Sequence, residues 1–228
     1  MLVETSSNGA TEPASPRGVS GSCLVDRRVD RIDAYLDRLA SADPTPGGGS
    51  AATLVGATGA ALCGMVARIT AAGQRHAAVR PEAEAIAAEA DALRDRFQAA
   101  RPLDEAAYER VVAAAALPKT PDTRDARTAA LQSALAGAAE APLAVAGLAA
   151  EGIALAGRTA ALGNTHLVSD VECALHFFRA TLAAAAANVR INHRFIKDAE
   201  IVRAQDERLV AIARAAQESV DRLLPALS

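Results

Sequence analysis

The sequence predicts an all-α protein, a multi-helix up-and-down bundle with one buried helix rich in alanine and glycine. Of the 228 residues 51% are hydrophobic but only 3% aromatic, and long alanine runs favour helices because alanine loses no rotamer freedom on folding. The β-branched and aromatic clusters that mark strands are scarce. Apolar residues recur at helical spacing, and neither a βαβ pattern nor a repeat of fixed period is found.

The charge and cysteine content exclude several classes of protein. A net charge of -3, with acidic and basic residues interspersed, argues against nucleic-acid binding, which needs a clustered cationic face. Cys23, Cys63 and Cys173 lie far apart, which suits reduced thiols in the cytoplasm better than a disulfide framework. The four histidines are isolated from one another, so we expect no metal site.

Two regions are expected along the chain. Residues 1–22 are rich in Ser, Gly, Pro and Thr and lack the apolar core of a secretory signal, so they predict a disordered tail. Residues 23–228 suffice for one helical domain. The uncharged stretch Ala51–Ala67 is barely long enough to cross a membrane and is mostly Ala, Gly and Thr. It therefore predicts a buried core helix and no membrane contact.

The first two helices are defined by apolar spacing and by prolines. A helix is expected over Leu24–Leu39, with an apolar face formed by Val25, Val29, Ile32, Leu36 and Leu39. Pro44 and Pro46 end it. In the following uncharged helix, small residues recur every four positions at Ala52, Gly56, Ala60 and Gly64. Such a stripe lets another backbone approach closely, which offsets the cost of glycine in a helix.

Prolines and capping residues predict the remaining helices. Pro81 begins a helix with a seam of Ile86, Ala90, Leu93 and Phe97. A separate short helix is expected over Leu103–Ala116, and Pro121 and Pro142 each begin a further helix. Gly163 with Asn164 closes the second of these. Ser169 and Glu172 predict a capping box that starts a long helix near Asp170. A last amphipathic helix carries the apolar residues from Ile201 to Leu223.

Four blocks of sequence, in order, resemble the formiminotetrahydrofolate cyclodeaminase / methenyltetrahydrofolate cyclohydrolase family. The first is Pro-Thr-Pro-Gly-Gly-Gly-Ser at 44–50, continuing to Thr70. The second is Asp-Glu-Ala-Ala-Tyr at 104–108 followed by Leu-Pro-Lys at 117–119, and the third is 127–132 followed by Ala-Pro-Leu at 141–143. The fourth comprises Gly163-Asn164, Ser169-Asp170 and Asn-Val-Arg-Ile-Asn at 188–192. The resemblance spans residues 29–198.

The resemblance implies an all-helical homodimer that binds a tetrahydrofolate derivative, as substrate, near the subunit interface without a metal. One family activity closes 5-formiminotetrahydrofolate to the 5,10-methenyl form with loss of ammonia. The other hydrolyses the methenyl form to 10-formyltetrahydrofolate. Two further hypotheses remain open: a non-catalytic dimer that binds folate or a partner protein, and an enzyme of the same fold that acts on a non-folate substrate.

Asp104 is the candidate catalytic residue, because both reactions need proton transfers that a positioned carboxylate supplies. The alternative is that Asp104 only caps its helix. Gly47, Gly48, Gly49 and Ser50 are candidate substrate-binding residues, since their backbone N–H groups lie at a helix N-terminus and can hold carboxylates or a flat ring. A tight loop leading into a buried helix is the simpler alternative.

Further substrate-binding candidates come from the resembling blocks and from charge. Asn188 and Asn192 lie four residues apart and project to one side of a helix, where their amides need the pterin edge or another backbone as partner. Asp170 is a candidate whose alternative role is to compensate the helix dipole. The remaining candidates are Asn164, Arg75 and Lys119.

Two positions depart from the family pattern. After the second helix the family has glycine, two or three basic residues and an aromatic residue, where this chain has Gly-Gln-Arg-His-Ala at 73–77. Two places before Asp104 the family often has an acidic residue, and this chain has Pro102. Both differences favour a changed substrate or lost turnover.

Overall fold

The structure is a computed structural model that describes residues 32–227, and within them it contains helices and no strand. The longer helices are α1 (Ile32–Leu39), α2 (Gly48–Ala72), α3 (Arg80–Ala115), α4 (Arg124–Ala161), α5 (Val168–His193) and α6 (Ala199–Leu227). Short 3-10 segments η1 (Gln74–Val79), η2 (Pro121–Thr123) and η3 (Thr165–Leu167) join them. The expected all-α class is therefore confirmed for these residues.

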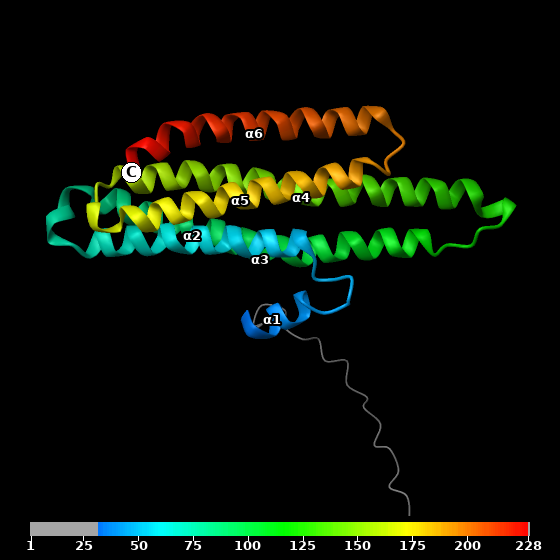
Figure 1. The fold of residues 1–228 in the computed structure, drawn as a ribbon, viewed down its shortest axis with the longest axis horizontal. Helices are drawn as coiled ribbons and strands as arrows, with labels where there is room; N and C mark the ends of the chain where they lie inside the picture. The colour runs from blue at the N-terminus through cyan, green and yellow to red at the C-terminus, as the bar shows by residue number, and fades with distance from the viewer. Residues whose placement is uncertain (1–31, 228) are drawn as a thin grey trace, which may run out of the picture.

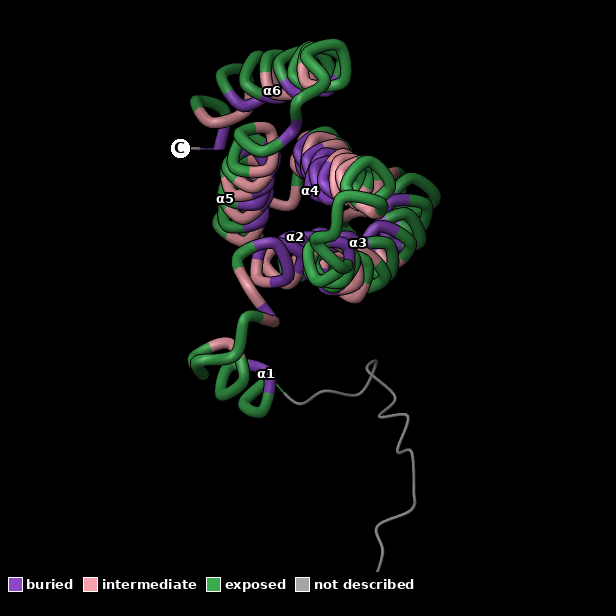
Figure 2. Tube along the Cα trace, turned by 90° about the vertical axis from the view of Figure 1, so that its right-hand side faces the viewer, coloured by how far each residue is buried: buried purple, intermediate pink, exposed green. Residues whose placement is uncertain are grey.

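Helices α2 to α5 run up and down in a four-helix bundle, and the two remaining helices lie outside it (Figure 1). Viewed along the bundle, α2 and α3 form one layer, α4 and α5 form the next, and α6 covers α4 and α5 (Figure 2). Helix α1 lies on the opposite side from α6, next to α2. The expected tail 1–22 and the start of the first helix lie outside the described residues.

Two glycines let two phenylalanine rings fill the centre of the bundle. A Cβ at Gly56 would overlap the ring of Phe97, and a Cβ at Gly152 would overlap the ring of Phe178. Both rings are fully buried and stack with their centroids 6.3 Å apart. The small residues of α2 and α4 thus make room for aromatic side chains of α3 and α5, as close packing requires.

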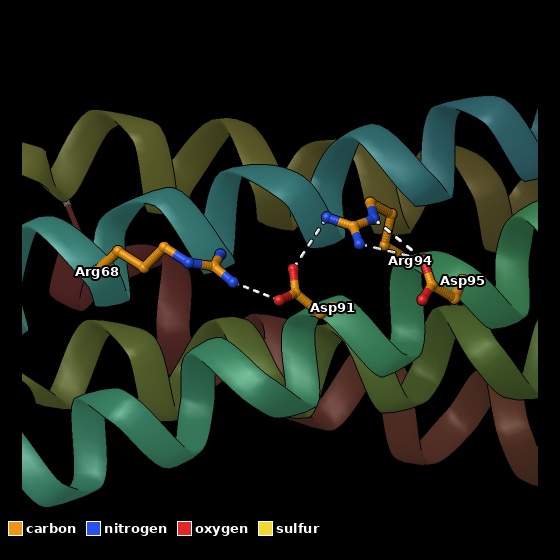
Figure 3. A network of polar contacts seen from close by, with 4 residues as sticks. All are labelled: Arg68, Asp91, Arg94 and Asp95. Atoms are coloured by element: carbon orange, nitrogen blue, oxygen red, sulfur yellow. Dashed lines mark hydrogen bonds and ion pairs between the residues drawn. The ribbon is translucent and has the colours of Figure 1, made fainter. Parts of the chain in front are cut away.

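A charged network on the surface ties α2 to α3. Asp91 of α3 accepts hydrogen bonds from Arg68 of α2 and from Arg94, at 2.9 Å in the second case, and Arg94 also pairs with Asp95 (Figure 3). These side chains are largely solvent-exposed, so the network orients the helices more than it stabilises them.

The prediction that prolines separate the later helices is wrong at two positions. Helix α3 continues through Pro102, and α4 continues through Pro142, so the expected short helix from Leu103 and the helix start at Pro142 do not exist. An internal proline removes one backbone hydrogen bond. In α4 the freed carbonyl of Ala138 accepts a hydrogen bond from Asn192 Nδ2 at 3.0 Å. A neighbouring helix thereby replaces the missing donor.

The predicted capping box at Ser169 and Glu172 is also wrong. Helix α5 begins at Val168, so Ser169 lies inside its first turn, and the residue before the helix makes no side-chain cap. The capping side chain is that of Asn164, which accepts the His166 N–H at the start of η3. The expected left-handed glycine is confirmed, because Gly163 has a φ of 73°.

In the described part of the first helix, the expected apolar face is not the side that is most buried. Ile32 and Leu36 are 66% and 49% exposed, whereas Tyr35 is only 2% exposed. Tyr35 is buried because it packs beneath Arg101 of α3, with the guanidinium carbon 5.3 Å from the ring centroid. A cation over an aromatic face and a buried hydroxyl contact outweigh the apolar spacing.

Two helical stretches, Gly48–Ala72 and Pro121–Ala161, are long and apolar enough by composition to cross a membrane. Within the bundle 61% and 50% of their apolar windows are buried. Core helices of this kind pass the same test of length and composition.

Helix α2 is 25 residues long and α3 is 36 residues long, so α3 extends further along the axis of the bundle than α2 does. Helix α2 begins beside the Asp104 region of α3, and the rest of α3 projects beyond it with the first part of α4 (Figure 1). From Asp104 to Ala115 this arm extends about 16 Å at 1.5 Å per residue. The N-terminus of α2 therefore lies at the base of a projecting pair of helices.

Candidate active site

The first turn of α2 packs directly against Asp104 of α3. A Cβ at Gly49 would overlap the carboxyl group of Asp104, so only glycine allows the helix to approach this closely. The Asp104 carboxylate accepts a hydrogen bond from the backbone N–H of Ser50. It thus occupies a free donor at a helix N-terminus, where a negative charge is favoured.

Ser50 also links three side chains in a buried network. Its hydroxyl donates to Glu105 Oε1 at 3.4 Å and lies 3.1 Å from the Tyr35 hydroxyl. Because the Ser50 proton points to Glu105, the Tyr35 hydroxyl is the donor of the second bond. Tyr35, Ser50 and Glu105 are all buried, at 2%, 0% and 8% exposure.

The surroundings of Asp104 make its proton harder to lose. Partial burial raises the pKa of Asp104 above its ordinary value, the nearby Glu105 carboxylate raises it further, and the Ser50 N–H lowers it. Desolvation and a like charge both disfavour the ionised form. A carboxylic acid whose pKa moves toward neutrality is suited to both giving and taking a proton.

Asn188 of α5 completes the convergence at the N-terminus of α2. A Cβ on the exposed Gly48 would lie 3.8 Å from Asn188 Nδ2, and this amide nitrogen donates to Ala184 O at 2.9 Å. Asn192, one turn further, donates to Ala138 O and to Asn188 O, both at 3.0 Å. The Asn188 amide thus binds a carbonyl of its own helix, whereas the Asn192 amide also binds the backbone of another helix, α4, which is one of the two expected partners.

The structure brings Gly47–Ser50, Asp104 and Asn188 together, but it places the other candidates elsewhere in the subunit. Arg75 lies in η1, beyond the C-terminal end of α2, about 36 Å along that helix from Gly48. Asn164 is at the same end of the bundle, where its Nδ2 donates to Thr70 Oγ1 at 3.0 Å.

Asp170 and Lys119 are also distant from this convergence. Asp170 lies in the first turn of α5, about 27 Å from Asn188, in the position that suits dipole compensation. Lys119 is exposed in the loop beyond the arm formed by α3 and α4. That these residues bind substrate stays a prediction.

Three cavities lie away from the Gly49–Asp104 contact. One of about 460 Å³ lies between α3 and α4, and one of about 550 Å³ lies between α5 and α6. The third, of about 510 Å³, includes Asn164 and lies near the end of α6. On the surface near Asp104, Leu103 and Tyr108 are 62% and 44% exposed. The described chain therefore leaves these two apolar side chains exposed beside this carboxylate.

No group of three or more His, Cys, Asp or Glu side chains between residues 32 and 227 could hold a metal ion. Burial raises the pKa of the Cys63 thiol to about 11, so this thiol stays protonated and is a poor nucleophile at neutral pH.

Sequence reasoning missed Glu105 and Tyr35. Glu105 adjoins Asp104, but its burial depends on how α1 and α2 cover α3, which no local pattern reveals. Tyr35 is one of only two tyrosines in the chain. Its position between charged residues on a short helix could have indicated a role in the site, because a buried tyrosine hydroxyl usually has a polar partner.

Comparison with known proteins identifies the family of this chain. Residues 31–211 match the formiminotransferase-cyclodeaminase family. The chain is 36% identical over 170 residues to a methenyltetrahydrofolate cyclohydrolase of Methylorubrum extorquens, covering 74% of this chain and 82% of that protein. It is 32% identical over 176 residues to the formimidoyltransferase-cyclodeaminase of Rattus norvegicus, covering 73% of this chain but 31% of that protein.

A solved structure shares the same architecture. The crystal structure of formiminotetrahydrofolate cyclodeaminase from Thermotoga maritima superposes with a TM-score of 0.69 at 25% identity, covering 86% of this chain and 98% of that one. With the family match spanning most of the helical region, the chain belongs to the formiminotransferase-cyclodeaminase family.

Proposed function

We propose that this protein is a one-carbon folate enzyme that hydrolyses 5,10-methenyltetrahydrofolate to 10-formyltetrahydrofolate. The observation that carries the proposal is Asp104, a half-buried carboxylate held by the Ser50 N–H against the glycine turn of α2. The identity to a methenyltetrahydrofolate cyclohydrolase over 82% of that protein supports this choice of reaction.

The reaction requires a group that takes a proton and then returns it. The substrate is a cation whose charge is shared by N5 and N10 across the bridging carbon. Water adds to this carbon and loses a proton, after which the bond from carbon to N5 breaks and N5 gains a proton. The remaining hydroxyl proton leaves as the formyl group forms, so one water is consumed and one proton is released.

Asp104 suits this sequence of proton transfers. As a carboxylate it stabilises the cationic substrate and accepts the proton of the attacking water. As a carboxylic acid it then protonates N5. Because burial and Glu105 raise the pKa of Asp104, its carboxylate is a stronger base toward the attacking water, and its acid form is populated closer to the working pH.

The substrate would lie against the first turn of α2, in a homodimer within the cytoplasm. Gly47 and Gly48 expose backbone N–H groups at a helix N-terminus, which can bind a flat ring edge or a carboxylate. The exposed Leu103 and Tyr108 beside Asp104 offer an apolar surface that a second subunit would cover. No nucleic-acid or membrane partner is part of this proposal.

Absorbance of the methenyl chromophore tests the function directly. Purified protein should remove the methenyl signal, and Asp104→Asn should lower kcat by about 10²–10⁴-fold because it can no longer shuttle a proton. Asp206→Asn, the same chemical change at an exposed position of α6, should leave kcat unchanged. An Asp104→Asn protein as active as the original would refute the role of Asp104.

A cyclodeaminase is the second candidate, supported by the solved cyclodeaminase structure of which 98% is covered. In that reaction N10 attacks the formimino carbon, loses its proton, and ammonia leaves after protonation. The same two transfers suit Asp104. Appearance of the methenyl signal from 5-formiminotetrahydrofolate would identify this activity. If neither reaction occurs and calorimetry still detects folate binding, the protein is a non-catalytic folate-binding protein.

A further inference from the structure

Glu105 is the one charged residue that the bundle buries among residues 32–227, with 8% of its surface exposed. The remaining buried polar residues are serine, threonine and glutamine. Removing a carboxylate from water costs several kcal/mol unless hydrogen bonds compensate. A buried glutamate next to the candidate catalytic aspartate therefore calls for a physical reason.

Ser50 makes one of the contacts that compensate this cost, and it also contacts Asp104. Its backbone N–H donates to Asp104, while its side-chain hydroxyl donates to Glu105 Oε1 at 3.4 Å. One residue in the first turn of α2 thus binds both carboxylates of α3. The Tyr35 hydroxyl, 3.1 Å from Ser50 Oγ, keeps the serine side chain in this orientation from the side of α1.

We propose that Glu105 is a positioning residue that acts through the candidate catalytic Asp104, because it anchors Ser50, the residue that also binds the Asp104 carboxylate. The proposal rests on the function proposed above. Glu105 does not touch the substrate in this scheme. It keeps a proton on Asp104 for delivery to N5, and it holds the Ser50 N–H that aligns the Asp104 carboxylate.

Within residues 32–227, the charged and titratable groups on the helices around Asp104 are as follows. On α3 they are Glu105 and, within one turn on either side, Arg101 and Tyr108. Helix α1 contributes Tyr35, whose ring lies under Arg101. Helix α2 has no charged side chain before Arg68, and the nearby side chain of α5 is the neutral Asn188. Of these groups, Glu105 is the charged one that acts on the pKa of Asp104.

The pH profile of kcat/KM distinguishes this role from a structural one. Glu105→Gln keeps a hydrogen-bond acceptor for Ser50 and removes the charge, so the pKa of Asp104 should fall. The limb of the kcat/KM profile that reports the ionisation of Asp104 should move to lower pH. The direction is the same whether Asp104 acts as an acid or as a base in the rate-limiting step. Glu109→Gln removes an exposed carboxylate one turn along the same helix and should leave the limb in place.

A measurement that needs no turnover separates this inference from the proposed function. The ¹³C carboxyl resonance of Asp104, assigned by its loss in Asp104→Asn, can be titrated in the original protein and in Glu105→Gln. A lower midpoint in Glu105→Gln supports the inference even if neither folate substrate reacts. An unchanged midpoint, or an equal change in Glu109→Gln, overturns it while leaving the enzymatic proposal intact.

Glu105→Asp provides a second variant, checked for folding by circular dichroism, in case Glu105→Gln does not fold. It retains the charge but withdraws the carboxylate from Ser50, so the pH limb should stay in place while kcat falls about tenfold through misalignment. Unchanged kcat together with an unchanged limb would contradict the anchoring role.

Discussion

At the scale of single residues, the candidate site depends on Gly49, because a glycine has no Cβ. Gly49 lies where any Cβ would overlap the Asp104 carboxyl group. The same turn supplies the Ser50 N–H that this carboxylate accepts. The glycine run that resembles a substrate loop therefore also has a packing role, because it lets α2 approach a carboxylate of α3.

Gly49→Ala should displace Asp104 and impair catalysis while the bundle still folds. A displacement of about 1 Å can lower kcat about 10²-fold, which the methenyl absorbance assay measures. The control is Gly147→Ala in α4, where an added Cβ meets nothing within 4 Å. That variant should keep its activity and gain about 0.5–1 kcal/mol of stability, since alanine is the better helix former. Wild-type activity in Gly49→Ala would contradict the close contact.

At the scale of elements, long helices persist through prolines because their neighbours supply the missing donors. Pro142 has no N–H for the carbonyl of Ala138, and Asn192 of α5 donates to it instead. This contact joins α4 to α5 close to Asn188 and the first turn of α2. The asparagine that sequence reasoning assigned to the substrate thus has a structural partner, and a substrate role for it is untested.

A double-mutant cycle between Asn192 and Pro142 tests this substitution of donors. Asn192→Ala should lower the free energy of unfolding by about 1–2 kcal/mol, because it leaves the Ala138 carbonyl without a partner. In a Pro142→Ala background the new backbone N–H can donate to that carbonyl, so Asn192→Ala should cost clearly less. Urea unfolding provides both values. If the losses in unfolding free energy of the two single variants simply add in the double variant, and Asn192→Ala binds folate more weakly, a substrate role for Asn192 is favoured instead.

At the scale of the whole molecule, the α3–α4 arm leaves an apolar face of α3 without a partner. Beyond the first turn of α2, Tyr108 and Val112 are only about half covered by the described chain, with 44% and 48% of their surface exposed. They continue along the same face of α3 as Asp104, at steps of four residues. A second copy of the chain packing on this face would enclose the candidate site and bury these side chains.

Val112→Glu should therefore disrupt the proposed homodimer. Light scattering after size exclusion should give twice the chain mass of 23.3 kDa for the original protein and the single mass for Val112→Glu, with activity reduced in parallel. Val210→Glu, at a 55% exposed valine on α6 at the other side of the bundle, should change neither. A monomeric original protein would contradict the assembly, and a dimeric Val112→Glu would place the interface elsewhere.

Several features of the fold were predictable because they depend on local chemistry. Alanine-rich composition and apolar spacing predicted an all-helical bundle, and Gly163 was recognised as a left-handed helix end. The helix starts expected at Leu103 and Pro142 were wrong, because packing against neighbouring helices sustains α3 and α4 through an internal proline. The capping box at Ser169 was also wrong, since α5 starts at Val168, two residues before the expected start near Asp170.

By itself, the sequence determined the helical class, the glycine turn and the presence of a carboxylate in a recognisable block. Only the tertiary structure decided which residues meet: Asp104 against Gly49, and Ser50 between Asp104, Glu105 and Tyr35. The reason is that helix formation depends on neighbours within about four residues, whereas burial and pKa depend on side chains brought together from distant helices. Glu105 is separated from Ser50 by 55 residues, and no helical periodicity extends across that distance.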